Sequence, residues 1–241
     1  GNVLATLQFG DGKTEGDPGM LAEFDRNGRL VRSGSSADKA FPTSRIRTYG
    51  LTALPKIDRA VTTSSPMGNE ATEHVVQVWR LSTLELLKTI PVPKVAGDTT
   101  HMYPFELRTM ADGETVFLNS YMCGFYRIAG LASSPTIERV MVIPNTMGCS
   151  VPHIAGNLMV MPIAYAHRVA TFDISNPAKP VEIASFATDT TFFPHWVSGD
   201  PGSDRLVMTD QGDGSPRVMI ASTPSSSAAS KGASANRAIG R

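Results

Sequence analysis

The chain has 241 residues, of which 41% are hydrophobic and 18% are charged, and its 22 basic and 22 acidic residues give a formal net charge of zero. This balance argues against a general surface for nucleic acid or anionic membranes, and no apolar run approaches the roughly 18 residues that would span a bilayer. Because the chain opens on Gly1, its start is expected to be processed or truncated, and an export signal could have been lost with it. A periplasmic and a cytoplasmic location therefore both stay open for a soluble protein.

Helical periodicity is almost absent from the sequence. Short β-branched and aromatic runs instead alternate with Gly, Pro, Asn and Asp turns, which predicts an all-β fold of many short strands. Five units follow one another, at about residues 1–32, 46–93, 101–144, 148–188 and 193–222, and the first and last are incomplete. In the first three units we expect strands near Val3–Gln8, Gly19–Phe24, Arg29–Ser33, Tyr49–Leu54, Ala60–Ser64, His74–Leu81, Leu86–Val92, Phe105–Met110, Thr115–Asn119, Gly124–Ile128 and Ile137–Ile143.

A tripeptide marks the start of three units. Xaa-Pro-His occurs at residues 151–153 and 193–195, and Tyr103-Pro104-Phe105 is a third copy that has lost the histidine. This third copy has His101 two residues before its tyrosine. Repeats of this kind, roughly 40–50 residues apart, are typical of a β-propeller.

A second repeated position precedes the third strand of three units. His74, Tyr121 and His167 each lie five residues before an aromatic residue, and those aromatic residues are Trp79, Tyr126 and Phe172. The recurrence of two separate positions supports genuine repeats more strongly than any single motif does.

The repeats predict an all-β protein whose residues 1–222 form a β-propeller of four-stranded blades. The sequence holds about five blades' worth of residues, and the N-terminal blade is incomplete. A β-sandwich of similar strand count is the alternative. Residues 223–241 are rich in Ser and Ala and have no strand pattern, which predicts a disordered tail.

Several segments are similar to those of a known family. They are Tyr49–Ser64, His74–Trp79, Leu86–Ile90, the PFELR run at 104–108 and the segment Thr171–Pro177. Together they resemble the selenium-binding protein family, which includes the methanethiol oxidases, over roughly residues 15–222. The resemblance implies a seven-bladed propeller and a copper enzyme that converts methanethiol into formaldehyde, hydrogen sulfide and hydrogen peroxide. The chain departs from the family in carrying only four to five blades' worth of sequence and no match to the family's N-terminal cysteine motif.

The main site hypothesis is a metal held by His101, His153 and His195. In a propeller, equivalent positions of successive blades converge on one axis, and clustered imidazoles suit copper or zinc. His74 and His167 would form a second ring or act as outer-shell partners. The alternative is that Pro-His simply suits the start of a strand and that each ring bonds a neighbouring carbonyl.

Carboxylates and cysteines near these histidines have more than one interpretation. Glu106 is either a second-shell acceptor or metal ligand, or a surface ion-pair partner of Arg108, and Asp98 is expected to be a turn residue. Cys123 and Cys149 would come close together in adjacent blades. They could form a disulfide or supply a soft copper ligand, but the preferred interpretation is a pair of buried, inert thiols.

Two classes of function follow from these features. The first is a redox metalloenzyme that uses copper, or zinc as the alternative metal, and oxidises a small thiol at the histidine cluster. The second is a non-catalytic propeller scaffold that binds a ligand or a protein partner. A calcium-dependent lactonase is disfavoured because that chemistry would need Glu, Asp and Asn at the axis. No P-loop, nucleophile elbow or dinucleotide fingerprint is found in the sequence.

Overall fold

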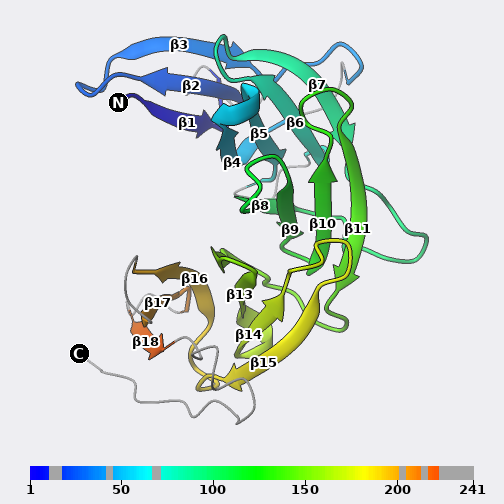
Figure 1. Ribbon diagram of the computed structural model, residues 1–241, viewed down its shortest axis with the longest axis vertical. Coiled ribbons are helices and arrows are strands. Elements are labelled where there is room, and N and C mark those ends of the chain that lie inside the picture. The colour runs from blue at the N-terminus through cyan, green and yellow to red at the C-terminus, as the bar shows by residue number, and fades with distance from the viewer. Residues whose placement is uncertain (11–17, 42–45, 67–71, 201–204, 213–216, 223–241) are drawn as a thin grey trace. The chain divides into compact units, whose positions relative to one another are not determined.

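The computed structural model describes residues 1–10, 18–41, 46–66, 72–200, 205–212 and 217–222. Within these ranges the protein is all-β, with eighteen strands and two short 3₁₀ turns (Figure 1). The predicted tail, residues 223–241, lies outside the described residues. The chain divides into two compact units, and each is described by itself. Unit 1 comprises Gly1–Ser120 and Tyr126–Arg139, and unit 2 comprises Tyr121–Phe125 and Val140–Arg241.

Every sheet follows chain order, so that each strand pairs with the strand next to it in sequence. The first three sheets contain β1 (Val3–Leu7), β2 (Met20–Phe24) and β3 (Leu30–Ser35); β4 (Thr48–Leu54), β5 (Arg59–Ser64), β6 (Val75–Arg80) and β7 (Glu85–Pro91); and β8 (Pro104–Thr109), β9 (Val116–Ser120), β10 (Gly124–Ala129) and β11 (Thr136–Val142). The ends of β10 and β11 are assigned to unit 2. The predicted strands are confirmed within one or two residues of their bounds.

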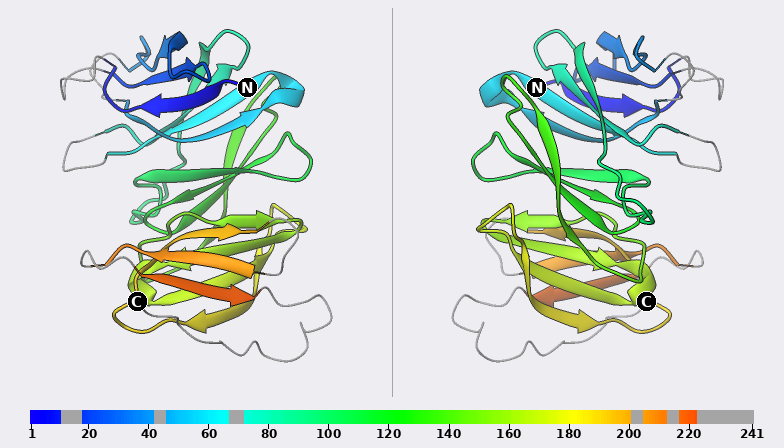
Figure 2. Two further views of the ribbon diagram at one scale, coloured as in Figure 1. Left: turned by 90° about the vertical axis from the view of Figure 1, so that its left-hand side faces the viewer. Right: turned by 90° about the vertical axis from the view of Figure 1, so that its right-hand side faces the viewer.

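Unit 2 holds one four-stranded and one three-stranded sheet of the same kind (Figure 2). They contain β12 (His153–Ala155), β13 (Leu158–Ile163), β14 (Arg168–Asp173) and β15 (Val181–Ala187); and β16 (Pro194–Gly199), β17 (Arg205–Asp210) and β18 (Val218–Ser222). Three four-stranded sheets with short links, each in chain order, confirm the predicted blade.

The central strands of the four-stranded sheets are buried on both faces. In unit 1, Val61 and Val76 of one sheet pack with Leu107 and Leu118 of the next. The aromatic residues predicted to close the third strands, Trp79, Tyr126 and Phe172, are at most 1% exposed. Continuous apolar strands are therefore explained by sheets stacked face to face within each unit.

The β16–β18 sheet is buried on one face only. In β17, buried Leu206 and Met208 alternate with exposed Arg205, Val207 and Thr209. Large apolar side chains are also exposed on the neighbouring strands and on the first sheet. They are Trp196, Val218 and Ile220 in unit 2, and Val3, Leu7, Leu30 and Val31 in unit 1.

The sequence did not predict the two 3₁₀ turns, Pro55–Ile57 (η1) and Ala164–Ala166 (η2). Each ends at a residue with left-handed backbone, Asp58 after η1 and His167 after η2. Single turns of this type occur as connectors between strands, and three residues are too few for a periodic pattern in the sequence.

Candidate functional site

A contact between a histidine and an aromatic ring is found in each unit and explains the two repeated sequence positions. In unit 1, His74 lies edge to face with Tyr103, with ring centroids 5.5 Å apart. In unit 2, His167 makes the same contact with Phe193, at 4.5 Å. In both cases the histidine directly precedes a third strand, and its partner directly precedes the proline that opens the following sheet. The contact is therefore part of how successive sheets are joined.

His101 is an addition to this repeat. Its ring lies edge to face with His74, with centroids 5.6 Å apart. The equivalent position before Phe193 is Thr191, so unit 2 has no second histidine there. A residue that departs from a repeated structural contact is a better functional candidate than one that belongs to it. The histidine pair of His74 and His101 is our candidate site.

The His101 ring is partly buried and has one nitrogen without a partner. Within the described part of the chain, its buried Nδ1 atom has no hydrogen-bond partner. Burial lowers the pKa of His101, and the nearby Lys94 lowers it further. A hydrogen bond to the Asp98 backbone and the Asp98 carboxylate oppose this shift. Metal-ligating histidines are usually neutral, with the ring nitrogen that does not bind the metal hydrogen-bonded to a carbonyl or carboxylate.

His74 is held differently. Its Nδ1 atom accepts a hydrogen bond from the backbone N–H of Tyr103, with the two nitrogens 3.4 Å apart. Burial lowers the pKa of His74, with smaller contributions in the same direction from His101 and Lys94, whereas Glu73 raises it. Both shifts favour the neutral form of the two rings at pH 7.

Tyr103 has a backbone conformation that the sequence did not predict. Its φ angle is +55°, in the left-handed region that residues other than glycine rarely adopt. Such conformations persist where the surrounding structure imposes them, and they cluster at functional sites. The only sequence feature that marks Tyr103 is its place in the repeated tripeptide.

A polar network fixes the loop that carries His101. Asp98 accepts a hydrogen bond from the Thr100 backbone N–H at 2.6 Å and forms an ion pair with Arg139. Hydrogen bonds from Thr100 and the pairing with Arg139 lower the pKa of Asp98 to about 2. The interpretation of Asp98 as a turn residue is confirmed.

Glu106 lies in β8 and pairs with Arg108 of the same strand, with Oε2 and Nη1 2.8 Å apart. Of the two predicted roles for Glu106, the structure shows the ion pair with Arg108.

The other predicted ligands, His153 and His195, lie in unit 2 at the starts of β12 and β16. The backbone carbonyl of His195 accepts a hydrogen bond from the Val151 N–H, which joins the two strands. The His153 Nδ1 atom accepts one from the Gly199 N–H at 3.3 Å. A Cβ atom at Gly199 would lie 2.3 Å from the His153 ring, so this close approach requires glycine.

Within the described residues, no three side chains of His, Cys, Asp or Glu gather in a way that could hold a metal ion. His101 belongs to unit 1, whereas His153 and His195 belong to unit 2. The three-histidine metal site stays a prediction. The second-ring histidine His167 has its Nδ1 atom 3.2 Å from the carbonyl oxygen of Phe192, within hydrogen-bond distance.

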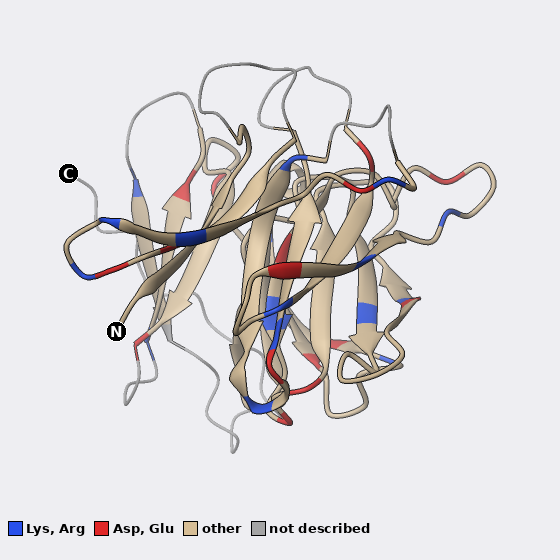
Figure 3. Cartoon of the chain, turned by 90° about the horizontal axis from the view of Figure 1, so that it is seen from above, with Lys and Arg blue, Asp and Glu red and all other residues tan. Residues whose placement is uncertain are grey.

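Charges of both signs are interspersed over the described strands and loops (Figure 3). Among the described residues, no helix has the length and apolar character needed to cross a membrane.

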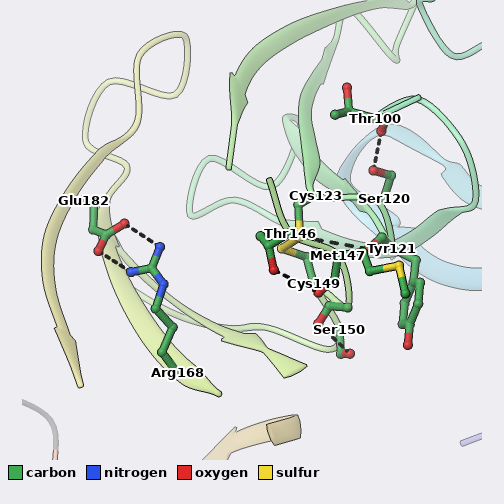
Figure 4. The surroundings of a disulfide bond; sticks show 11 residues. Thr100, Ser120, Tyr121, Cys123, Thr146, Met147, Cys149, Ser150, Arg168 and Glu182 are labelled. Atoms are coloured by element: carbon green, nitrogen blue, oxygen red, sulfur yellow. Dashed lines mark hydrogen bonds and ion pairs between the residues drawn. A yellow bond between two sulfur atoms is a disulfide. The ribbon is translucent and has the colours of Figure 1, made fainter. Parts of the chain in front are cut away.

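The two cysteines form a disulfide, which corrects the preference for inert thiols (Figure 4). Cys123 and Cys149 are fully buried, with Cα atoms 5.1 Å apart. The loops that carry them are joined because Gly148 N–H donates to the Tyr121 carbonyl at 2.7 Å. The repeat spacing predicted that the two cysteines lie close together, but it could not predict whether they are oxidised to a disulfide. That depends on the geometry of the pair and on the cellular compartment.

Comparison by sequence gives no relatives: no protein-family model matches the chain, and a search of curated proteins finds no match. Comparison by structure does find similar proteins. A hypothetical selenium-binding protein from Sulfolobus tokodaii has a TM-score of 0.68 at 14% identity and covers 87% of this chain and 55% of its own. The β-propeller domain of Cps50 (Swd1) from Myceliophteria thermophila has a TM-score of 0.60 at 9% identity, with coverages of 81% and 61%.

A third solved structure, a functionally unknown protein from Desulfotomaculum acetoxidans, has a TM-score of 0.56 at 9% identity and coverages of 84% and 62%. At these identities the likeness shows the fold alone, and the fold is that of a β-propeller. The chain spans between about half and two thirds of the length of each of these three structures.

Proposed function

We propose that the protein is a metal-binding β-propeller that resembles selenium-binding protein and methanethiol oxidase, and that it oxidises a small thiol at a histidine cluster. The metal would be copper, with zinc as the alternative. The observation that carries the proposal is the histidine pair, in which the buried Nδ1 atom of His101 has no partner within the described residues.

A buried polar atom without a partner is costly, and in a native protein it calls for an explanation such as an unseen ion. His101 Nδ1 fits a metal ligand because the ring is neutral, and imidazole nitrogen suits both copper and zinc. His153 and His195 are the further ligands that the repeat pattern proposes. The similarity to a hypothetical selenium-binding protein supports the same family of folds.

Copper would supply the electron transfer that couples thiol oxidation to dioxygen. For methanethiol the balanced reaction consumes one dioxygen and one water and yields formaldehyde, hydrogen sulfide and hydrogen peroxide. The carbon loses two electrons and dioxygen gains them. The part of the chain is to bind and orient the thiol, and Lys94 is a cation near both rings.

Metal content tests the proposal. The purified protein is loaded with Cu²⁺ or with Zn²⁺, dialysed, and analysed by inductively coupled plasma mass spectrometry. We expect about one equivalent of metal in the wild type and its loss in His101→Ala and in the His153→Ala/His195→Ala double variant. Thr191→Ala, at the position equivalent to His101 in unit 2, is the matched control and should keep its metal.

Copper-loaded protein is then incubated with methanethiol, and hydrogen peroxide is measured. Peroxide production that disappears with the metal supports thiol oxidation. A wild type that binds neither metal rules out the metalloenzyme. Metal binding without peroxide leaves a metal site and excludes the oxidase.

The second candidate function, a scaffold for a protein partner, has one observation in its favour. Trp196, Val207 and Ile220 expose apolar surface on one face of the β16–β18 sheet. A scaffold would tolerate the histidine substitutions and would lose partner binding when Trp196 is replaced by a charged residue.

A further inference from the structure

His74 and His167 occupy the same position in their units but contact opposite kinds of backbone group. The His74 Nδ1 atom faces the N–H of Tyr103, whereas the His167 Nδ1 atom faces the carbonyl oxygen of Phe192. An amide N–H can only donate, and a carbonyl oxygen can only accept. The two histidines are therefore held in opposite tautomers when neutral.

The assignment follows from which nitrogen has its lone pair occupied. In His74 the Nδ1 lone pair accepts from Tyr103, so the ring proton is on Nε2. In His167 the proton is on Nδ1, where it is donated to Phe192, and Nε2 is left with its lone pair. A metal-ligating histidine has the His167 arrangement, because the nitrogen that does not bind the metal usually donates to a carbonyl or carboxylate. His74 has the reverse arrangement.

The left-handed backbone of Tyr103 accompanies this difference. Tyr103 has a φ angle of +55°, and Phe193, its equivalent in unit 2, is not among the residues with positive φ. In unit 1 the strained residue presents its N–H to the histidine, and in unit 2 the histidine meets a carbonyl instead. The left-handed conformation of Tyr103 is therefore found together with the Nε2–H tautomer of His74, because the Tyr103 N–H needs an acceptor at Nδ1.

We propose that His74 is a hydrogen-bond donor through Nε2–H, and not a metal ligand, for a small anionic acceptor such as a thiolate bound beside His101. The pair is then asymmetric. His101 has a buried Nδ1 atom without a hydrogen-bond partner among the described residues, and His74, in edge-to-face contact at 5.6 Å, offers an N–H. Tyr103 is the positioning residue that fixes the tautomer of His74. The proposal deepens the thiol-oxidising function above and rests on it for the identity of the acceptor.

The tautomers of His74 and His167 can be measured by NMR. Protein labelled with ¹⁵N-histidine is studied without metal at about pH 8, above the ordinary histidine pKa, by long-range ¹H–¹⁵N correlation of the imidazole rings. The variants His74→Gln and His167→Gln assign the two spin systems. We expect the Nε2–H form for His74 and the Nδ1–H form for His167. An Nδ1–H form at His74 would overturn the proposal.

Zn²⁺ titration, followed by the same spectra, separates a donor from a ligand. With a small thiol present as the anionic acceptor, His74→Leu should weaken Zn²⁺ binding by about 10- to 100-fold, as expected for loss of an outer-shell partner. His74→Gln, which keeps a side-chain N–H, should recover most of that loss, whereas His101→Gln should abolish binding. If His74→Gln loses Zn²⁺ as completely as His101→Gln does, His74 is a ligand and the proposal fails.

Failure of the proposed function would look different. In that case the wild type would bind no Zn²⁺, while the metal-free spectra would still decide the tautomer of His74.

Discussion

The imidazole pair of unit 1 illustrates how burial sets the charge of a side chain. His74 and His101 both have a lowered pKa, chiefly because burial disfavours the imidazolium form. The protonated ring is stable in water and costly in the folded protein. The surroundings therefore favour the neutral form of the pair, and the Nδ1 atom of His101 has no hydrogen-bond partner within the described residues.

This neutrality predicts how stability depends on pH. Below pH 6.5, the ordinary pKa of histidine, the unfolded chain binds protons that the folded chain does not, so the free energy of unfolding falls with falling pH. The loss begins near pH 7 and continues down to the lowered pKa values of the two rings. Urea unfolding at a series of pH values measures it.

His101→Gln is the control for that series, because glutamine does not titrate. Its free energy of unfolding should fall less between pH 7 and pH 5 than that of the wild type, where the range follows from the ordinary histidine value of about 6.5. Equal slopes for the two proteins would show that His101 has the same pKa folded and unfolded.

The sequence predicted the residues of the site better than their roles. His74 and His101 were candidates because of their places in the repeat, and Asp98 was recognised from its turn composition. What the sequence could not predict is the direction of each hydrogen bond. That direction depends on whether an N–H or a C=O of Tyr103 or Phe192 faces the ring, and a rotation of one peptide unit decides it.

Strands are the elements that the sequence predicted best. The predicted bounds of the strands in the first three units agree with the structure within one or two residues, because turn residues such as Gly, Asp and Asn interrupt most of the apolar runs. Contacts between strands of neighbouring sheets could not be predicted from these turn residues. Gly50 is an example, since its hydrogen atom faces a carbonyl of the next sheet and nothing in its local sequence indicates this.

Gly50→Ala should destabilise unit 1 strongly. A Cβ atom at Gly50 would lie 2.2 Å from the backbone oxygen of Phe105, and that oxygen also accepts a hydrogen bond from the Thr63 hydroxyl at 2.8 Å. Because the obstacle is backbone, β4 and β8 must separate, and overpacking of this kind costs about 1–3 kcal/mol or more. Denaturant unfolding measures the loss.

Gly156→Ala is a comparison that isolates the clash. No described atom lies within 4 Å of the position that a Cβ atom would take at Gly156, but the residue has a φ angle of +59°. Alanine at this position causes no clash, so its only cost is that of the left-handed backbone conformation, about 1–2 kcal/mol. If Gly50→Ala costs no more than Gly156→Ala does, the close approach of β4 and β8 is not a constraint on stability.

For the molecule as a whole, the predicted propeller of four-stranded blades is confirmed as the fold. The number of blades could be estimated from repeat spacing because each blade is one supersecondary unit of similar length. The disulfide was the main error at this scale. Two cysteines in separate repeats give no indication of redox state, and burial alone suits a thiol as well as a cystine.

Removal of the disulfide should lower the free energy of unfolding of the region that it closes. Cys123 and Cys149 are 26 residues apart. In the loop-entropy description, a cross-link of that span stabilises the folded state by about 3–4 kcal/mol because it restricts the unfolded chain. We expect dithiothreitol, or the Cys123→Ala/Cys149→Ala double variant, to shift the unfolding midpoint to lower denaturant. Dithiothreitol should have no further effect on the double variant, and identical midpoints with and without it in the wild type would contradict the prediction.

The apolar side chains exposed on the β1–β3 and β16–β18 sheets have a practical consequence. Valine, leucine, isoleucine and tryptophan side chains face solvent there, on a chain whose formal net charge is zero. Repulsion between molecules is weakest when the net charge is near zero, and exposed apolar surface then favours association. The protein should bind tightly to phenyl resin, precipitate at low ammonium sulfate, and keep best in a buffer of low salt set well away from neutrality.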